Sequence, residues 1–119
     1  MNVYQKLLAE ILVELKRPDV DPRHVEGYIR LQHPTLGGLS KEEFLQETKI
    51  ALTCIDATGW SGSETLALSY GLTVKCYEVR SASELHAAFG STKRAEALSY
   101  AKELAERLGV KAFVIGVSS

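Results

Sequence analysis

Apolar residues in the first part of the chain recur at the spacing of amphipathic helices. Residues 3–16 repeat apolar side chains every three or four positions, which predicts a first helix. A second helix is expected to begin at Asp21, an N-cap residue with Pro22 at the first helical position, and to end before Pro34. The chain is therefore expected to open with two helices joined by a short connection.

Two capping-box sequences of the form Ser-x-x-Glu predict two more helices. The first, at residues 40–43, is expected to open a helix that runs to about Ala57. The second, at residues 61–64, is expected to open a short helix that ends at Gly71 in a left-handed C-terminal cap. Together with the first two helices, these signals predict a four-helix region over residues 1–72.

The period of the pattern changes in the second part of the chain. Residues 73–80 are rich in β-branched and aromatic residues and predict a strand. Residues 81–89 alternate as a second strand of a hairpin would, although their Ser-x-x-Glu start also suits a short helix. Residues 91–108 predict a long helix with an alanine-rich buried face. Residues 110–117 are apolar on both faces, which indicates a central strand.

The expected fold class is α+β. It consists of a helical region over residues 1–72 and a β-β-α-β region over residues 73–119, packed as one compact unit. The second region would be a three-stranded sheet covered by one long helix. Because one helix leaves a sheet face and an edge uncovered, we expect the N-terminal helices, a second copy or a partner protein to cover them.

One stretch carries a resemblance to known proteins. Residues 76–116, CYEVRSASELHAAFGSTKRAEALSYAKELAERLGVKAFVIG, resemble the small strand–strand–helix–strand domains of uncharacterised bacterial and phage proteins. The likeness consists of a strand that ends in Phe, a Ser/Thr before an alanine-rich helix, and a final strand. It implies this arrangement over about residues 74–117 and brings no catalytic or binding residue. Residues 21–40 resemble segments of short phage and mobile-element proteins of no known activity.

Composition and charge narrow the class of protein. The chain has 119 residues, of which 45% are hydrophobic and 24% charged, as in a soluble single-domain protein. Its net charge is −1, too small to indicate a polyanionic partner. Neither the apolar run needed to cross a membrane nor the uninterrupted core of an export signal is found, since Glu10 and Glu14 interrupt the first helix. A cytoplasmic location is therefore expected.

Histidines and glycines suggest chemistry that their spacing does not support. His24 and His33 are nine residues apart on one helix, so their imidazoles should point to opposite sides. Gly37 and Gly38 lack the strand before them and the Lys-Ser/Thr after them that a phosphate loop needs. No metal, cofactor or cofactor-binding residue is therefore predicted, and this glycine pair is expected to end one helix and orient the next.

Cysteine chemistry defines one alternative function. Cys54, expected near the C-terminal end of a helix, and Cys76 both lie in apolar runs and are expected to be reduced, buried residues. If His86 activated either thiol, the protein would be a small Cys/His enzyme. The sequence favours a protein without catalytic residues.

The leading hypothesis is a non-catalytic binding module that acts by protein–protein contact or self-association. An inhibitor or adaptor of the kind that phages and mobile elements encode would fit this size. The candidate anchors are three aromatic residues near the junction of the two regions: Trp60, Tyr70 and Tyr77. A second hypothesis is a nucleic-acid-binding regulator that uses basic residues of the second region: Lys75, Arg80, Lys93 and Arg94.

Overall fold

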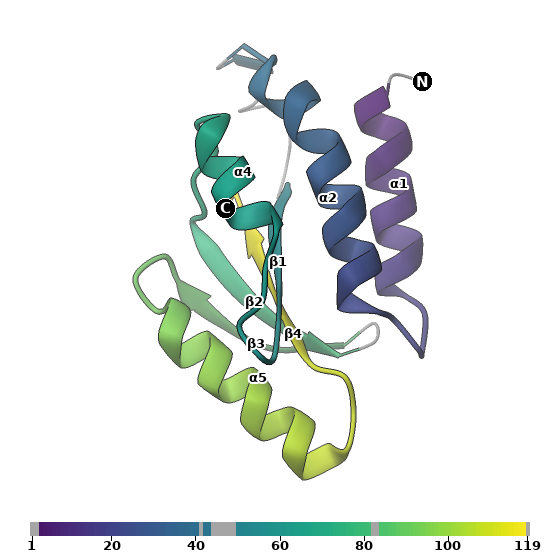
Figure 1. Cartoon of the computed structure of the whole chain (residues 1–119), viewed down its shortest axis with the longest axis vertical. Helices are drawn as coiled ribbons and strands as arrows, with labels where there is room; N and C mark the ends of the chain where they lie inside the picture. Colours follow the sequence, from purple (N-terminus) through teal and green to yellow (C-terminus); the bar gives the residue numbers. More distant parts are fainter. Residues whose placement is uncertain (1–2, 41, 44–49, 82–83, 119) are drawn as a thin grey trace.

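Helices and strands alternate along most of the chain. The computed structural model describes residues 3–40, 42–43, 50–81 and 84–118. Within these ranges the elements follow in the order α1 (Val3–Leu15), α2 (Pro22–Gly37), β1 (Ala51–Asp56), α4 (Ser63–Ser69), β2 (Cys76–Ser81), β3 (Glu84–Gly90), α5 (Arg94–Leu108) and β4 (Phe113–Val117) (Figure 1).

The four strands form one sheet in the order β1-β4-β2-β3, and every neighbouring pair is antiparallel. β4 pairs with β1 on one side, where Cys54 lies opposite Ile115, and with β2 on the other, where Val79 lies opposite Val114. β1 and β2 are therefore parallel to each other with β4 between them. The expected central position of the last strand is confirmed.

The protein is α+β overall, as expected, but the expected arrangement is wrong in two parts. The sheet has four strands and not three, and the helices do not form an N-terminal four-helix region, because residues 51–56 are strand β1 and not the end of a helix. The reason is that the first five residues of β1 are all buried. A continuous apolar run of this length suits a buried strand as well as a buried helix. Residues 44–49 of the expected third helix lie outside the described residues.

Several predicted signals are confirmed. The amide of Glu43 donates a hydrogen bond to Ser40 Oγ (3.2 Å) and the amide of Ser40 donates one to Glu43 Oε1 (3.3 Å), as a capping box requires. Gly71 and Gly109 adopt positive φ angles of 73° and 64° after α4 and α5. Residues 84–90 form a strand in a hairpin with β2 and not a short helix.

Three helix boundaries differ from the prediction. α2 continues through Pro34 to Gly37, because the proline removes one hydrogen bond while the buried Leu36 beyond it keeps the last turn packed on the core. α4 begins at Ser63 and has no side-chain cap, because its N-cap residue is Gly62; the hydroxyl of Ser61, the expected cap, lies 3.1 Å from the Ser63 hydroxyl instead. α5 begins at Arg94, after Lys93 as N-cap, and not at Ser91.

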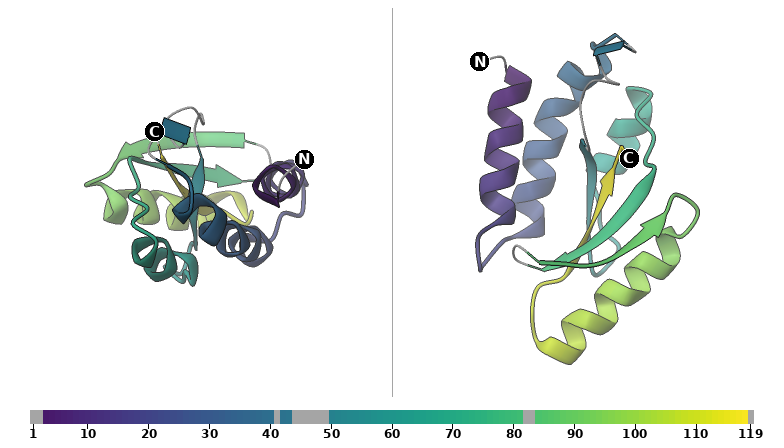
Figure 2. Two further views of the ribbon diagram at one scale, coloured as in Figure 1. Left: turned by 90° about the horizontal axis from the view of Figure 1, so that it is seen from above. Right: turned by 180° about the vertical axis from the view of Figure 1, so that it is seen from behind.

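Helices cover both faces of the sheet. Cys54 and Ile115 face the buried side chains of α1 and α2, whereas their chain neighbours Ile55 and Val114 face α5. Successive strand residues point to opposite faces, so the two sets build two hydrophobic layers. Figure 2 shows α1 and α2 side by side at one end of the molecule and α5 at the other. Every residue of β4 is buried.

Side chains of α2 shield the outer edge of β1. Gln32 Nε2 donates a hydrogen bond to the carbonyl oxygen of Ala51 (2.8 Å). His33 Nε2 lies 2.7 Å from the carbonyl oxygen of Leu52, and because a carbonyl only accepts, this nitrogen carries the proton. Both side chains are fully buried, so α2 is held against β1 by polar as well as apolar contacts. An edge strand protected in this way does not pair with another chain there.

Candidate functional site

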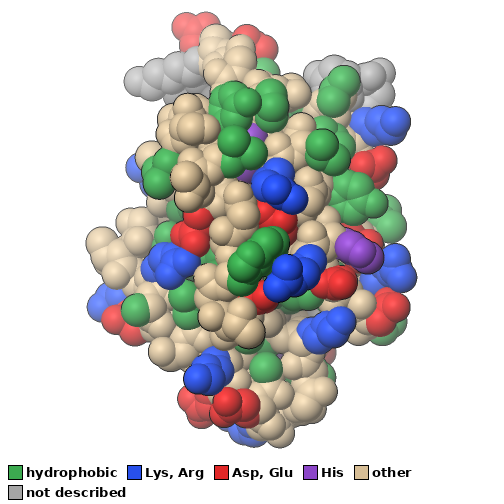
Figure 3. All heavy atoms as spheres, in the orientation of Figure 1, with side chains coloured by type: hydrophobic (Ala, Val, Ile, Leu, Met, Phe, Trp, Pro, Cys, Tyr) green, Lys and Arg blue, Asp and Glu red, His purple; other side chains and the backbone are tan. Residues whose placement is uncertain are grey.

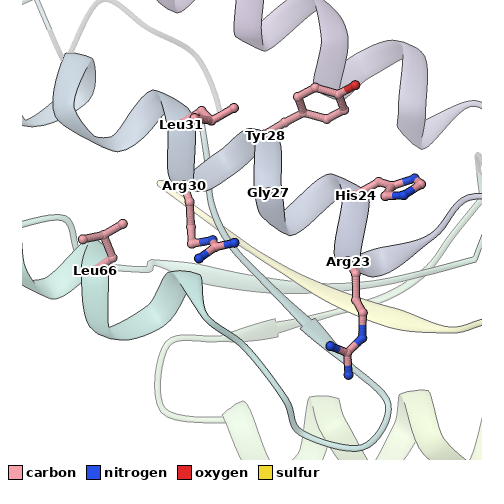
Figure 4. Close-up of a pocket in the computed structure, with 7 residues that line it drawn as sticks. All are labelled: Arg23, His24, Gly27, Tyr28, Arg30, Leu31 and Leu66. Atoms are coloured by element: carbon pink, nitrogen blue, oxygen red, sulfur yellow. The ribbon is translucent and has the colours of Figure 1, made fainter.

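The largest described hollow lies on the outer face of α2. It has a volume of about 670 Å³ and reaches from α2 to the neighbouring helix α4 (Figure 4). We call it the α2 groove and define it by its lining residues Arg23, His24, Gly27, Tyr28, Arg30, Leu31 and Leu66.

The spacing of residues along α2 explains the groove. Val25 and Ile29 bury one face of the helix completely, and Gly27 lies on the opposite face. A Cβ atom at Gly27 would have no other atom within 4 Å, so this position opens into free space. Arg23 and Arg30 project to one side of α2, and Tyr28 and Leu31 to the other (Figure 4). The groove is therefore a notch with a basic flank and an apolar flank.

Arg23 is held by the loop that follows β1. Its guanidinium lies 4.2 Å from the centroid of the Trp60 ring, a cation–π contact, and 4.0 Å from the Asp56 carboxylate. Asp56 Oδ1 in turn accepts hydrogen bonds from the amides of Thr58 (2.9 Å) and Trp60 (3.1 Å). The loop thus fixes the indole ring, and the indole ring supports the guanidinium.

Arg30 is held by a buried carboxylate. Its Nε lies 2.9 Å from Oε1 of Glu26, a residue that is 1% exposed. Burial raises the pKa of Glu26, and the charges of Arg30 and Arg23 oppose that rise. Glu26 also packs closely on Gly62, where a Cβ would lie 2.7 Å from the same oxygen. Glu26 Oε1 has no hydrogen-bond partner among the described residues, so the contact between Glu26 and Arg30 is one of opposite charges, and the Arg30 side chain remains 49% exposed.

Each basic side chain at the groove has a carboxylate beside it. Arg23 lies 4.0 Å from Asp56, Arg30 lies 2.9 Å from Glu26, and His24 lies 3.7 Å from Glu14. The side chains of Arg23 and Arg30 are nevertheless 61% and 49% exposed. Figure 3 shows basic, acidic and apolar side chains intermingled over this face of the molecule. The groove therefore offers a ligand two exposed arginines, each already beside one carboxylate, and an apolar flank.

Exposed apolar side chains extend the surface beyond the groove. Leu31 on α2 is 63% exposed and Leu68 on α4 is 70% exposed. Tyr28 also lines a smaller hollow between α1 and α2, together with Val13, which is 66% exposed. Exposed apolar side chains therefore occur on all three helices, α4, α2 and α1.

The three aromatic candidates lie in different places. Trp60 is exposed and supports Arg23 beside the groove. Tyr70 is exposed after α4 and packs on Gly37, where a Cβ would lie 2.7 Å from its ring. Tyr77 is buried under α5 and contributes to the core rather than to an exposed surface.

The basic candidates of the second region do not gather at the groove. Lys75 is exposed in the connection before β2. The other three are ion-paired with carboxylates: Arg80 with Glu78, Lys93 with Glu96, and Arg94 with Glu64. These pairs neutralise the charges on which the nucleic-acid hypothesis depends.

The cysteines and His86 are not brought together. Cys54 is buried in β1, where its thiol donates to the carbonyl oxygen of Pro22 (3.4 Å) and burial raises its pKa well above the usual range. Its expected place near a helix C-terminus is thus wrong. Cys76 lies opposite Gly90 at one end of the β2–β3 hairpin, whereas His86 lies towards the other end. No cluster of three His, Cys, Asp or Glu side chains suited to a metal ion occurs in the described ranges.

The main groove residues were missed by the sequence analysis. Arg23, Gly27 and Arg30 follow the i, i+4, i+7 spacing of one helical face, opposite the buried Val25 and Ile29. This spacing was the available signal, because a glycine between two arginines on the outer face of a helix marks a notch between two charges.

Comparisons with known proteins provide no further guide to the function. No protein-family model, curated protein or solved structure matches the chain. Among the helices that the structure describes, none combines the length and apolarity needed to cross a membrane. The function is therefore argued from the α2 groove.

Proposed function

We propose that the protein is a non-catalytic binding module that docks a partner protein on the α2 groove. The observation that carries this proposal is the position of Arg23 and Arg30, each held in place beside a notch at Gly27 and opposite exposed apolar side chains. Arginine and tryptophan are the residue types that contribute most to binding energy at protein interfaces. Side chains that are already held in place lose less conformational entropy on binding.

A protein partner fits the surroundings of the groove better than a small molecule. Leu31, Leu68 and Val13 are all largely exposed, on three different helices. A small ligand in the notch would leave these side chains in water, whereas a protein surface would cover them. The same apolar content distinguishes the groove from a nucleic-acid surface, which is dominated by unpaired positive charge.

Site-specific crosslinking tests the proposal. A photoreactive phenylalanine derivative at position 31 is expected to form one discrete protein adduct in cells, because Leu31 lines the groove and is exposed. The same amino acid at position 102, on the exposed side of α5, serves as the matched control and should not form that adduct. Identical adducts from both positions, or none from position 31, would show that the groove is not a docking site.

A variant that fills the groove provides a second test of the docking proposal. Gly27→Leu places a side chain into the notch without a clash, because nothing lies within 4 Å of the added Cβ atom. Leucine is also a better helix former than glycine by about 1 kcal/mol, so the variant should stay folded. The adduct from position 31 is expected to disappear in this variant. An undiminished adduct would contradict docking in the α2 groove.

A further inference from the structure

We infer that the docked segment is an acidic amphipathic helix with two carboxylates seven residues apart, which pair with Arg23 and Arg30. The inference rests on the proposed function and names the chemistry of the partner. Its starting point is that both arginines lie on one flank of the groove and stay 61% and 49% exposed although Asp56 and Glu26 lie beside them. A partner that brings carboxylates to this flank would add a second acidic contact to each guanidinium.

The spacing of the two arginines determines the spacing of the carboxylates. Arg23 and Arg30 are seven residues apart on α2, which is about 10.5 Å along the helix axis at 1.5 Å per residue. Two acidic residues at positions i and i+7 of a second helix are separated by the same distance along their own axis. A helix that lies along α2 can therefore meet both arginines at once.

The notch favours a helix over an extended peptide. Between two acidic residues at i and i+7, a helix presents the side chains at i+3 and i+4 on the same face. Apolar residues there would enter the space over Gly27 and contact Leu31 on the opposite flank. In an extended chain, neighbouring side chains point to opposite sides, so fewer apolar groups would reach the notch.

The two guanidinium groups are held in place by different neighbours. Trp60 supports Arg23 at its ring face and Asp56 lies 4.0 Å away, beyond hydrogen-bonding distance. The described residues form no hydrogen bond with the Arg23 guanidinium. Arg30 lies beside the buried Glu26 through Nε, and its side chain remains 49% exposed. A planar guanidinium can bind both oxygens of one carboxylate, which a lysine ammonium cannot do.

Synthetic helical peptides are the probe for this inference. One peptide carries leucines along one face and two Glu residues seven apart beside them, a second carries Gln at both positions, and a third has the two Glu residues five apart. Trp60 is the only tryptophan of the chain, so its fluorescence reports binding at the groove. The peptide with Glu residues seven apart is expected to bind at least about tenfold more tightly than the other two, because only its carboxylates can reach both guanidinium groups.

Variants assign the effect to the two arginines. Arg23→Lys keeps the charge but loses the planar fork, and should reduce the preference for Glu over Gln peptides by several-fold. Arg30 is tested in the double variant Glu26→Gln/Arg30→Gln, because removing Arg30 alone would leave the buried Glu26 unpaired. Arg107→Gln, an exposed arginine on α5 outside the groove, is the matched control and should leave all three affinities unchanged.

The outcomes separate this inference from the proposed function. Equal affinity for the Glu and Gln peptides, or no binding of any peptide, would overturn the inference that the docked segment is an acidic helix. A crosslinked partner at position 31 would still support the docking module in that case. Binding of a single-stranded oligonucleotide with the same dependence on Arg23, without peptide binding, would also overturn the inference. Absence of the crosslink at position 31 would refute the docking module itself.

Discussion

His33 donates a hydrogen bond of 2.7 Å from its Nε2 to the carbonyl oxygen of Leu52, and this contact joins α2 to the edge of the sheet. The imidazole is fully buried, and its Nδ1 has no hydrogen-bond partner among the described residues. Burial and, to a smaller extent, the charge of Arg30 lower the pKa of His33, against the raising effect of the Leu52 carbonyl. The folded protein therefore prefers this side chain neutral.

The free energy of unfolding is expected to fall as the pH drops below about 6.5. The unfolded chain binds a proton at His33 near its usual pKa of 6.5, whereas the folded chain takes it up only at lower pH. The stability contributed by the neutral His33 is fully present above pH 6.5. It is lost below that pH, by at most about 1.4 kcal/mol per pH unit. Urea unfolding at pH 7.5 and 5.5 measures it.

His33→Gln is the control for that experiment, because glutamine keeps an N–H donor for the Leu52 carbonyl but does not titrate. The variant should show a smaller loss of stability than the wild type between the two pH values. Parallel losses in both proteins would assign the pH dependence to other groups.

Glu26→Gln is expected to gain stability relative to the wild type as the pH rises from 4.5 to 7. Burial raises the pKa of Glu26 above 4.5, so the folded protein holds its proton more tightly than the unfolded chain does. The wild type therefore loses stability as the pH rises through the folded pKa, and the variant has no such loss. Urea unfolding of both proteins gives the difference. If the stability of the variant relative to the wild type fell as the pH rose, Arg30 would stabilise the charged carboxylate more than burial destabilises it.

Ser63→Ala is expected to destabilise the protein by about 1–3 kcal/mol. The buried Ser63 Oγ accepts a hydrogen bond from the amide of Cys54 (3.1 Å), and alanine would leave that buried donor unpaired. Ser69→Ala is the matched control, because the exposed Ser69 hydroxyl donates only to Leu66 of its own helix, and its effect should stay within about 0.5 kcal/mol. Equal unfolding midpoints for the two variants would contradict the role assigned to Ser63.

Gly116→Ala is expected to cost about 1–3 kcal/mol through overpacking. A Cβ at this position of β4 would lie 2.5 Å from Thr53 Oγ1 and 2.8 Å from Val74 Cγ2. Gly90→Ala at the end of β3 is the control, since its Cβ would have no atom within 4 Å. Thermal unfolding compares them, and an unchanged melting temperature for Gly116→Ala would show that β1 and Val74 move apart easily.

Thiol labelling should distinguish the two cysteines. Cys76 is partly exposed, whereas Cys54 is 1% exposed and burial raises the pKa of its thiol. Reaction with iodoacetamide at pH 8, followed by peptide mass spectrometry, is expected to modify Cys76 first and Cys54 only as the protein unfolds. Rapid labelling of Cys54 in the folded protein would revive the hypothesis of a reactive cysteine.

Local signals predicted the elements whose ends are defined by short-range geometry. The capping box at residues 40–43 and the glycines at 71 and 109 were placed correctly, because each depends on a hydrogen bond or a φ angle within a few residues. β1 was missed because its identity depends on pairing with β4, some sixty residues later in the chain. Local periodicity holds no information about that partner.

The groove was only partly accessible to sequence reasoning. Trp60 was selected as a candidate interface anchor, but its contact with Arg23 depends on the loop after β1, and β1 itself was assigned to a helix. The basic residues of the second region drew attention to charge, yet one of their ion pairs, between Arg94 and Glu64, joins elements distant in sequence. Charge balance at a site is decided by the fold.

The central position of β4 has a consequence for the order of folding during synthesis. The ribosome releases β1 and the β2–β3 hairpin first, but the strand that joins them, residues 113–117, emerges after both. Until then, β1 and β2 each have an unpaired inner edge, which is the condition that favours aggregation of nascent chains. Completion of the sheet must therefore await the last strand, and a chaperone that binds the nascent chain would be most useful in that interval.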